Sequence, residues 1–216
     1  MRLIYNDPPD PFLTETELDE WSGIQPAVIS DDINRQGVMK SFIKPIQQNV
    51  QFAGLALTVD LLVGTNAAIQ QALMRAFPGA VIVADAKDHQ DTAVIGGILY
   101  AAAQVAGLRA IVLDGSVRDL AEIRAGQLPV FARGVVPKGP HQGKGGSINI
   151  PIQCGGVVVN PGDLIVGDDD GVVVVRPDQT YGLLEKCRNR LAKEESTLAS
   201  LKNGVLPYEL EKLENN

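Results

Sequence analysis

The sequence predicts an α/β protein in which the strands of the sheet are buried on both faces. Between residues 54 and 132, short runs of apolar residues alternate with longer helical patterns. The short runs are continuously apolar, which is typical of strands that are covered on both sides. Aromatic residues make up only 5% of the chain, so the core must consist mainly of Val, Ile, Leu and Ala.

The first 26 residues are predicted to form an N-terminal arm. Three prolines fall within the first 13 residues, which favours an irregular segment. Residues 14–21 (TETELDEW) are typical of a short helix with Thr14 as its N-cap. Residues 27–37 (AVISDDINRQG) open the main domain and predict a short helix or a turn.

A regular pattern of strands and helices starts at residue 54. Each predicted helix ends at a Gly or at a Pro-Gly pair, and two of the predicted strands end at an aspartate. Strands are predicted at residues 55–63, 80–84, 110–113 and 130–132, and helices at residues 66–77, 92–106 and 117–125.

The second half of the chain predicts a different arrangement. A Gly-rich loop covers residues 134–146, and four short apolar strands follow, separated by glycine- and aspartate-containing turns. Such turns favour antiparallel hairpins or a small barrel-like layer. These strands are predicted at residues 148–150, 157–159, 164–166 and 172–175, and they complete a main domain over residues 27–177.

A long charged helix is predicted from Asp178 to about Leu201, with Gly204 just beyond its end. Basic and acidic residues occur along its whole length. This composition fits a solvated helix, and it fits equally a helix that contacts a neighbouring subunit. Residues 178–216 are therefore interpreted as a C-terminal helix and tail that lie between subunits.

The charge balance argues against several classes of partner. The chain has 19 basic and 26 acidic residues, a net charge of −7, and no basic stripe with interleaved aromatic residues. We therefore expect no nucleic-acid partner. No apolar run is long enough to span a membrane and the start shows no signal-peptide pattern, so we expect no membrane partner and a cytoplasmic location. Cys154 and Cys187 are interpreted as reduced thiols.

Candidate chemistry is concentrated where predicted strands end. Asp85 ends one strand, and residues 114–119 (DGSVRD) follow the next. Ligands of open α/β sheets bind beyond such strand ends. The Arg118 guanidinium suits a carboxylate, and the Asp119 carboxylate suits a hard divalent cation such as Mg²⁺. The alternative is a surface ion pair that caps a helix.

Residues 96–99 (GGIL) form a second feature. The two glycines leave room for backbone N–H groups to face an anion, but they also suit close packing of a helix on a strand. His141 and Lys144 are either a positively charged lid or solvated loop residues, and we favour the second interpretation. His89 and the 168–171 segment (DDDG) are interpreted as an exposed side chain and a turn.

Several longer stretches of the sequence resemble one known family. They are GLALT at residue 54, PGAVIVAD at 78, GGILYAAAQVAGLRAIVLDGSVRD at 96, LPVFARG at 128, INIPIQCGGVVVNPGDLIVGDDDGVVVV at 148 and GVL at 204. Over roughly residues 27–206 the chain resembles the RraA-like family. That family holds class II 4-hydroxy-4-methyl-2-oxoglutarate and 4-carboxy-4-hydroxy-2-oxoadipate aldolases, oxaloacetate decarboxylases and regulators of ribonuclease E. The resemblance implies an αββα sandwich in a ring-shaped trimer or hexamer, with sites between subunits.

The resemblance also implies roles for individual residues. Arg118 matches the arginine that grips the pyruvyl part of the substrate, and Asp119 matches the carboxylate that ligates Mg²⁺ or Mn²⁺. The backbone segment that binds the substrate carboxylate is matched by Gly96, Gly97, Ile98 and Leu99. Asp31 matches an acidic residue that an adjacent subunit lends to the site, and Glu194 or Glu195 matches a glutamate late in the C-terminal helix.

One position departs from the aldolases, which usually carry an acidic residue where Gly97 stands. This departure leaves the exact substrate and the proton route open. The ribonuclease regulators tend to lose the aspartate of the Arg-Asp pair, whereas this chain keeps Asp119. The resemblance thus implies a divalent-metal-dependent lyase that acts on a small 2-oxo-carboxylate. It would cleave a 4-hydroxy-2-oxo acid to pyruvate, decarboxylate oxaloacetate, or do both. The main alternative is a non-catalytic regulator that binds a protein partner.

Overall fold

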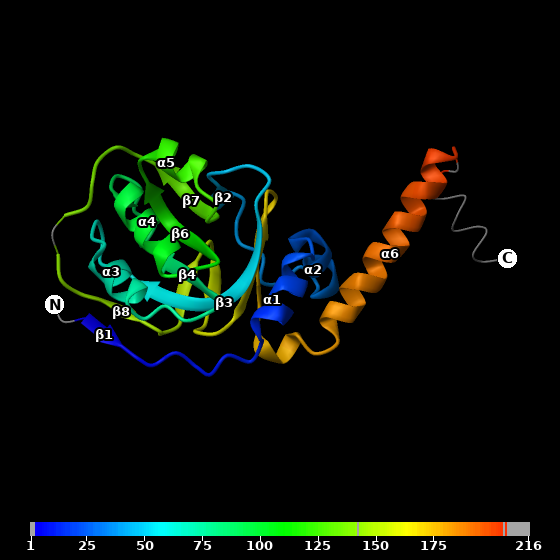
Figure 1. The fold of residues 1–216 in the computed structure, drawn as a ribbon, viewed down its shortest axis with the longest axis horizontal. Coiled ribbons are helices and arrows are strands. Elements are labelled where there is room, and N and C mark those ends of the chain that lie inside the picture. Colours follow the sequence, from blue (N-terminus) through cyan, green and yellow to red (C-terminus); the bar gives the residue numbers. More distant parts are fainter. Residues whose placement is uncertain (1–2, 142, 205, 207–216) are drawn as a thin grey trace.

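The computed structural model describes residues 3–141, 143–204 and 206 of the chain. Its centre is a mixed sheet of ten strands among these residues (Figure 1). Four parallel strands form the middle of the sheet, in the order β3 (Gln51–Asp60), β4 (Ala80–Asp85), β6 (Ala110–Val117) and β7 (Val130–Val135). The α/β class and the buried parallel strands confirm the prediction.

Apolar side chains alternate between the two faces of the parallel strands and form a core on each side. Ile82 and Ile111 belong to the core on one face, whereas Val83 and Val112 belong to the core on the other. The first of these faces is covered by three helices, α3 (Ala67–Leu73), α4 (Gly97–Val105) and α5 (Leu120–Ala125). Because helices and strands cover both faces, the middle strands consist mainly of apolar residues.

The other strands lie at the edges of the sheet or cross its second face. β11 and β12 form an antiparallel hairpin that pairs with the first half of β3, and β9 and β10 form a separate antiparallel pair, which confirms the predicted hairpins. The bounds of these strands are Leu3–Tyr5 (β1), Lys44–Pro45 (β2), Ala93–Ile95 (β5), Gly146–Ile148 (β8), Ile152–Cys154 (β9), Val157–Val159 (β10), Leu164–Asp168 (β11) and Gly171–Val175 (β12).

Helix α1 (Glu15–Ser22) begins where the sequence predicts it. The Thr14 hydroxyl accepts a hydrogen bond from the Glu17 N–H, and the Glu17 carboxylate accepts one from the Thr14 N–H. This capping box satisfies two backbone donors that a helix start leaves unpaired. The helix buries Leu18 and Trp21 in a third core, against β3, β11 and α2 (Pro26–Asp32). This part of the N-terminal arm is therefore packed on the domain.

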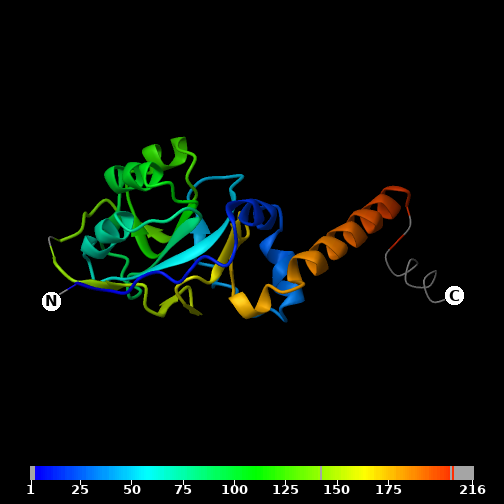
Figure 2. The ribbon, with the colours of Figure 1, turned by 60° about the horizontal axis from the view of Figure 1, so that its bottom comes forward.

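Helix α6 (Leu183–Lys202) leaves the body of the protein after its first two turns (Figures 1 and 2). Its base is held by Asp32 of α2, whose side chain is 1% exposed and pairs with Arg190 and Lys186. The hydrogen bond from Arg190 lowers the pKa of Asp32, because it stabilises the charged carboxylate. Beyond Leu191 most side chains of α6 are exposed. Among the described residues, no helix combines the length and apolar character needed to cross a membrane.

The prediction of one helix over residues 92–106 is wrong at its start. Residues 93–95 form strand β5, which pairs with the end of β6, and α4 begins only at Gly97. Gly96 precedes the helix in an extended conformation, with φ −140° and ψ −172°. Pairing with a neighbouring strand, which is distant in sequence, therefore overrides the local helical pattern.

The bounds of other helices and strands also differ from the prediction. β6 continues to Val117, and α5 begins at Leu120 rather than at Val117, because Asp119 has the left-handed conformation and interrupts the chain. The long helix begins at Leu183 rather than at Asp178, since Gly182 is also left-handed and Asp178 lies in a single 3₁₀ turn. The helix predicted at 66–77 spans only 67–73, the strand predicted at 148–150 spans 146–148, and strand β9 was not predicted.

Candidate functional site

Arg118 and Asp119 follow the end of β6, where its backbone leaves the sheet. The Arg118 N–H donates to the Ile95 carbonyl of β5 at 3.0 Å, which holds the pair beside the start of α4. Asp119 lies in the left-handed region, with φ 61° and ψ 49°. Asp tolerates this region better than most residues. The Asp119 carboxylate makes no capping hydrogen bond to α5, the helix that follows it.

The Asp119 carboxylate instead faces α4. Its Oδ2 atom accepts a hydrogen bond of 2.8 Å from the Gly97 N–H and lies 3.6 Å from Arg118 Nε. Both side chains are 40% exposed, so they form an accessible pair rather than a buried ion pair. The structure thus brings Arg118 and Asp119 together with the first residues of the 96–99 segment.

Gly96 leaves the space that this pair occupies. A Cβ atom at Gly96 would lie 2.5 Å from Asp119 Oδ2 and 2.9 Å from Arg118 Nε, which is closer than side-chain contacts allow. A Cβ atom at Gly97 would meet no atom closer than 3.6 Å. The extended conformation of Gly96 suits any residue. Glycine is therefore required at this position only because a larger residue would not fit.

Two further residues belong to this site, and the sequence interpretation missed both. Glu122 lies one helical turn after Asp119, and its Cγ is the nearest atom to the Cβ position of Gly97. The spacing of three residues on a helix is the signal that could have revealed it. Gly139 packs against Arg118, because a Cβ atom there would lie 2.6 Å from Nη1. No local signal marks Gly139, which contacts Arg118 only through the tertiary fold.

Backbone donors are available at the start of α4. The first N–H groups of any helix have no partner within it. The N–H of Gly97 donates to Asp119, which leaves those of Ile98 and Leu99 for a ligand. The side chain of Ile98 is 87% exposed, so nothing in the described chain covers this segment.

The donor set fits a magnesium-type cation. Asp119 has an accessible carboxylate, with a second carboxylate on the neighbouring turn at Glu122. Within the described ranges, no group of three or more His, Cys, Asp or Glu side chains is arranged around a metal position. Mg²⁺ needs only one or two carboxylates because it keeps several waters, whereas zinc sites use three or four protein ligands.

The predicted inter-subunit acids lie far from Arg118 and Asp119, on the opposite side of the molecule. Asp31 on α2 is 48% exposed and lies 3.8 Å from Arg35, and Glu194 and Glu195 are exposed on the outer part of α6. Figure 1 shows α2 and α6 on the opposite side of the molecule from α4 and α5. Within one chain the structure does not bring these acids to Arg118 and Asp119.

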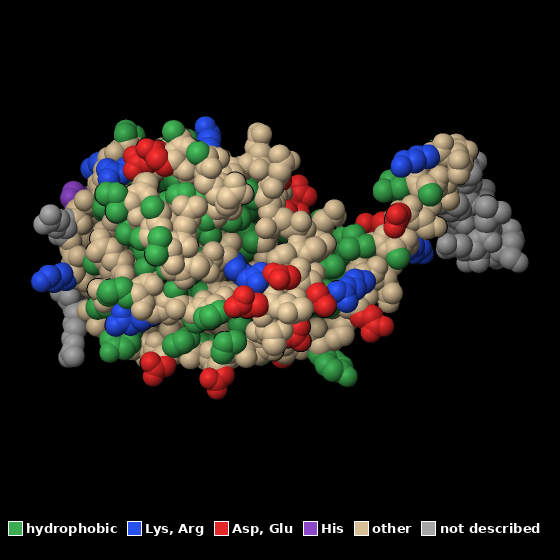
Figure 3. All heavy atoms as spheres, in the orientation of Figure 1, with side chains coloured by type: hydrophobic (Ala, Val, Ile, Leu, Met, Phe, Trp, Pro, Cys, Tyr) green, Lys and Arg blue, Asp and Glu red, His purple; other side chains and the backbone are tan. Residues whose placement is uncertain are grey.

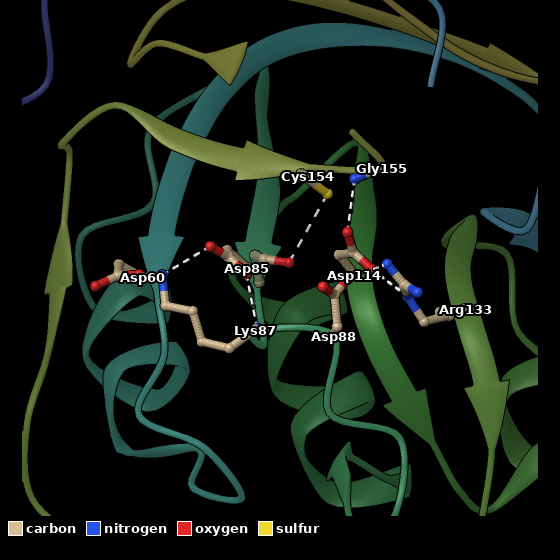
Figure 4. A network of polar contacts seen from close by, with 9 residues as sticks. Asp60, Asp85, Lys87, Asp88, Asp114, Arg133, Cys154 and Gly155 are labelled. Carbon is tan, nitrogen blue, oxygen red and sulfur yellow. Dashed lines mark hydrogen bonds and ion pairs between the residues drawn. The ribbon is translucent and has the colours of Figure 1, made fainter. Parts of the chain in front are cut away.

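A second polar cluster lies on the face of the sheet that β9 crosses (Figure 4). Asp85 and Asp114 are neighbours across β4 and β6. Asp114 pairs with Arg133 and accepts a hydrogen bond of 2.7 Å from the Gly155 N–H, while Asp85 pairs with Lys87 at 2.7 Å. The structure therefore divides the polar residues at the two strand ends into two groups. Asp85 and Asp114 point to one face of the sheet, whereas Arg118 and Asp119 lie beside α4.

The charges in this second cluster satisfy one another. The hydrogen bond from Arg133 to Asp114 raises the pKa of Arg133, and burial raises the pKa of the Cys154 thiol well above its ordinary value. The thiol of Cys154 is therefore protonated and unreactive at neutral pH. A hollow of about 360 Å³ lies over the cluster. We interpret the cluster as a clamp that ties β4, β6, β7 and β9 together.

Comparison with known proteins shows which family the chain belongs to. Residues 26–174 match the family described as RraA-like, Aldolase/RraA. The chain belongs to the RraA-like family. The family predicted from the sequence is thereby confirmed, and the matched range contains Arg118, Asp119 and residues 96–99.

Individual RraA-like relatives carry different names. A "Putative 4-hydroxy-4-methyl-2-oxoglutarate aldolase" of Halalkalibacterium halodurans is 36% identical over 197 residues, which cover 90% of this chain and 94% of the relative. The solved structure of Streptomyces coelicolor RraAS2, "an unusual member of the RNase ES inhibitor RraA protein family", has a TM-score of 0.79, 23% identity and coverage of 87% and 98%. A Geobacillus kaustophilus structure described as a 2-dimethylmenaquinone methyltransferase has a TM-score of 0.66, 30% identity and coverage of 71% and 95%.

Proposed function

We propose that this chain is a divalent-metal-dependent lyase that cleaves a carbon–carbon bond beside a 2-oxo-carboxylate. The observation that carries the proposal is the Arg118–Asp119 pair. Gly96 leaves the space that the pair occupies, and the Gly97 N–H donates a hydrogen bond that orients Asp119. The family and the name of the Halalkalibacterium halodurans relative support it. The reaction is retro-aldol cleavage of a 4-hydroxy-2-oxo acid to pyruvate, decarboxylation of oxaloacetate, or both.

In this proposal the chain's own residues bind and orient the substrate. The Arg118 guanidinium donates two parallel hydrogen bonds to the substrate, one to the keto oxygen and one to the nearer carboxylate oxygen, and the N–H groups of Ile98 and Leu99 donate to the other carboxylate oxygen. Asp119 holds the cation, Mg²⁺ or Mn²⁺, which supplies Lewis-acid stabilisation of negative charge on the keto oxygen. Arg118 also stabilises that charge more strongly as it develops, which is the condition for accelerating the reaction.

Both reactions break the C3–C4 bond of the 2-oxo acid and leave its electron pair on the fragment that becomes pyruvate. In retro-aldol cleavage the C4 hydroxyl loses its proton, C4 becomes a carbonyl, and the electrons of the C3–C4 bond move onto C3 and the keto oxygen. In decarboxylation the same electrons remain when CO₂ leaves. Protonation at C3 then gives pyruvate in each case. One site can therefore serve both reactions.

Glu122 is our candidate for the acidic residue that the aldolases usually carry at the position of Gly97. Its side chain approaches the space beside Gly97, with Cγ 3.6 Å from the Cβ position of that residue. A carboxylate there lies next to Asp119 and can order water in the site. Glu122 therefore offers an alternative source of the group that Gly97 lacks.

The test is pyruvate release from oxaloacetate and from 4-hydroxy-4-methyl-2-oxoglutarate. We expect release that requires Mg²⁺ or Mn²⁺, that EDTA abolishes, and that falls by about a hundred-fold or more in Arg118→Ala, because a charge-assisted bidentate contact is lost. Release that persists in EDTA contradicts the metal-dependent mechanism. No release from either acid removes the support for a lyase.

We also propose that the protein is a homo-oligomer, a trimer or a hexamer, in which another subunit brings acids to this site. The outer face of α4 is apolar and exposed at successive turns, with Ile98 87% and Val105 90% exposed. Figure 3 shows hydrophobic side chains on the face of the molecule that carries α3 and α4. Such a face, continuous with the 96–99 segment, suits burial against a second copy.

Sedimentation equilibrium tests this assembly. The wild type is expected to sediment as a trimer or hexamer, whereas Val105→Asp is expected to shift the protein towards monomer and to lower turnover with it. Val158→Asp is the control, because Val158 is 59% exposed on β10 and belongs to a different face. A monomeric wild type with full activity contradicts the shared site.

The second candidate function is a regulator that binds a protein partner. It is supported by the description of RraAS2 as a member of an RNase ES inhibitor family, and by the projecting charged helix α6. The two candidates differ in one result, since a regulator has no metal-dependent turnover and is unaffected by Arg118→Ala.

A further inference from the structure

A hollow of about 840 Å³ lies at the end of α5 that points away from Asp119. One wall is the segment between β2 and β3, residues 46–51, and the other is the end of α5 with the turn that leads to β7. Arg124 joins the two walls, because its Nε atom donates a hydrogen bond of 3.3 Å to the Ile46 carbonyl. Figure 1 shows α5, β7 and β2 close together. The volume is in the range of sites that bind small molecules.

The lining of this hollow is rich in amide side chains. Arg124 is the one charged side chain among the described residues that line it, so the hollow is locally positive in a chain with a net charge of −7. The amide side chains are those of Gln47, Gln48, Asn49, Gln51 and Gln127. Each amide offers two N–H donors and one carbonyl acceptor. A matching ligand must therefore carry an anionic group together with both donors and acceptors.

The walls of the hollow are held in place by hydrogen bonds within the chain. The Asp169 carboxylate accepts bonds of 2.9 and 3.2 Å from the N–H groups of Asn49 and Val50. The Gln47 side chain makes three hydrogen bonds to the backbone of the 123–130 segment. Because Gln47 is fully used in this way, it belongs to the wall, and the hollow is formed before any ligand binds.

The other polar groups of the hollow are available to a ligand. In the described part of the chain, the side chains of Gln48, Asn49, Gln51 and Gln127 make no hydrogen bond. Arg124 donates through Nε alone among the described residues, which leaves both terminal nitrogens of its guanidinium for a ligand. One guanidinium and four amides therefore line the same space with their hydrogen-bonding capacity unused.

The chemistry of these groups suits a nucleotide. Two guanidinium nitrogens bind a phosphate through parallel hydrogen bonds. Gln and Asn amides pair with the N6 and N7 atoms of adenine, because one amide supplies the acceptor and the donor that this edge requires. Val50 and Pro129 add apolar surface to the lining, against which the flat face of a base can pack.

We propose that this hollow binds a nucleoside monophosphate with an adenine base. Arg124 binds the phosphate, and the amides of Gln48 and Gln127 bind the edge of the base. The hollow is separate from the Arg118–Asp119 site, since α5 lies between them and its six residues span about 9 Å. The inference does not depend on the proposed function, because none of the described residues that line the hollow belongs to that site.

Titration calorimetry of the full-length chain with three ligands tests this site. The ligands are adenosine 5′-monophosphate, adenosine, which lacks the phosphate, and ribose 5-phosphate, which lacks the base. The wild type is expected to bind the nucleotide at least about ten-fold more tightly than either fragment, because a charge-assisted contact and a paired base edge each contribute. EDTA is present throughout, so that no metal ion binds the phosphate.

Two variants assign the two ends of the nucleotide. Arg124→Met should lower the affinity for the nucleotide to that for adenosine and leave the affinity for adenosine unchanged, which also shows that the variant is folded. The double variant Gln48→Ala with Gln127→Ala should weaken the nucleotide and adenosine alike and leave ribose 5-phosphate unchanged. Equal binding of all three ligands by wild type and Arg124→Met overturns the proposal.

Arg35→Met is the matched control for Arg124→Met. Arg35 is an arginine whose side chain is 82% exposed and that does not line the hollow, so its loss removes the same charge elsewhere. Nucleotide binding should be unchanged in Arg35→Met and also in Arg118→Ala, which removes the guanidinium of the other site. An equal loss in either variant overturns the proposal. So does the absence of nucleotide binding, or ribose 5-phosphate that binds as tightly as the nucleotide, since the base is then not recognised.

Discussion

Replacing Asp119 by asparagine is expected to abolish metal-dependent pyruvate release. A catalytic metal ion contributes several kcal/mol of transition-state stabilisation, and each 1.36 kcal/mol is a factor of ten, so the loss is expected to be about a thousand-fold or more. Asparagine is the informative replacement because it tolerates the left-handed conformation that Asp119 adopts at φ 61°. Alanine would add backbone strain to the loss of the carboxylate.

Asp88→Asn provides the matched control for this variant. Asp88 is also a left-handed aspartate, with φ 59°, and it is 77% exposed beside Arg133 on the other face of the sheet. The same chemical change there should leave turnover within about two-fold, because a surface ion pair contributes little. Steady-state release of pyruvate against Mn²⁺ concentration measures both variants. Full metal-dependent activity in Asp119→Asn would remove Asp119 from the site.

Gly96→Ala is expected to disable the site without removing any functional group. The added methyl group would lie 2.5 Å from Asp119 Oδ2 and 2.9 Å from Arg118 Nε, so one or both side chains must move. A displacement of about 1 Å in a reacting constellation costs about a hundred-fold in rate. We expect weaker Mn²⁺ binding and a loss of turnover of that size, while the fold is retained.

Gly97→Ala is the comparison variant for Gly96→Ala, and the measured quantity is the affinity for Mn²⁺. Its methyl group would meet nothing closer than 3.6 Å, and the N–H that binds Asp119 remains. Electron paramagnetic resonance of bound Mn²⁺ should therefore show an affinity within about three-fold of the wild type. If Gly96→Ala and Gly97→Ala bind Mn²⁺ alike, the close contact at Gly96 does not govern the site.

The clamp around Asp114 shows how the fold supports these two side chains. The pairing of β6 with β7 shifts register between Leu113 and Ser116. Asp114, which lies in this shift, is held by Arg133 and by the Gly155 N–H. β6 continues from this anchored point to Val117, and Arg118 and Asp119 follow directly after its end. The polar residues on one face thus steady the segment that carries the candidate site on the other.

Local signals in the chain were sufficient to predict the α/β class, the capped first helix and most of the strands. Continuous apolar runs predict buried strands whatever their partners are, and Thr14 with Glu17 needs only its own turn to form a capping box. The Arg118–Asp119 pair was also predicted, since both residues stand in one long stretch that resembles the family, and the family itself is confirmed.

Only the tertiary structure decided where that pair faces and what surrounds it. The strand over residues 93–95 forms because β6 lies beside it, and the left-handed Asp119 is held by an N–H on a helix 22 residues earlier. The close approach of Gly96 and Gly139 to Arg118 comes from segments on either side of it in sequence. Such contacts join residues that no local pattern connects, because the free energy that holds them comes from packing across the whole domain.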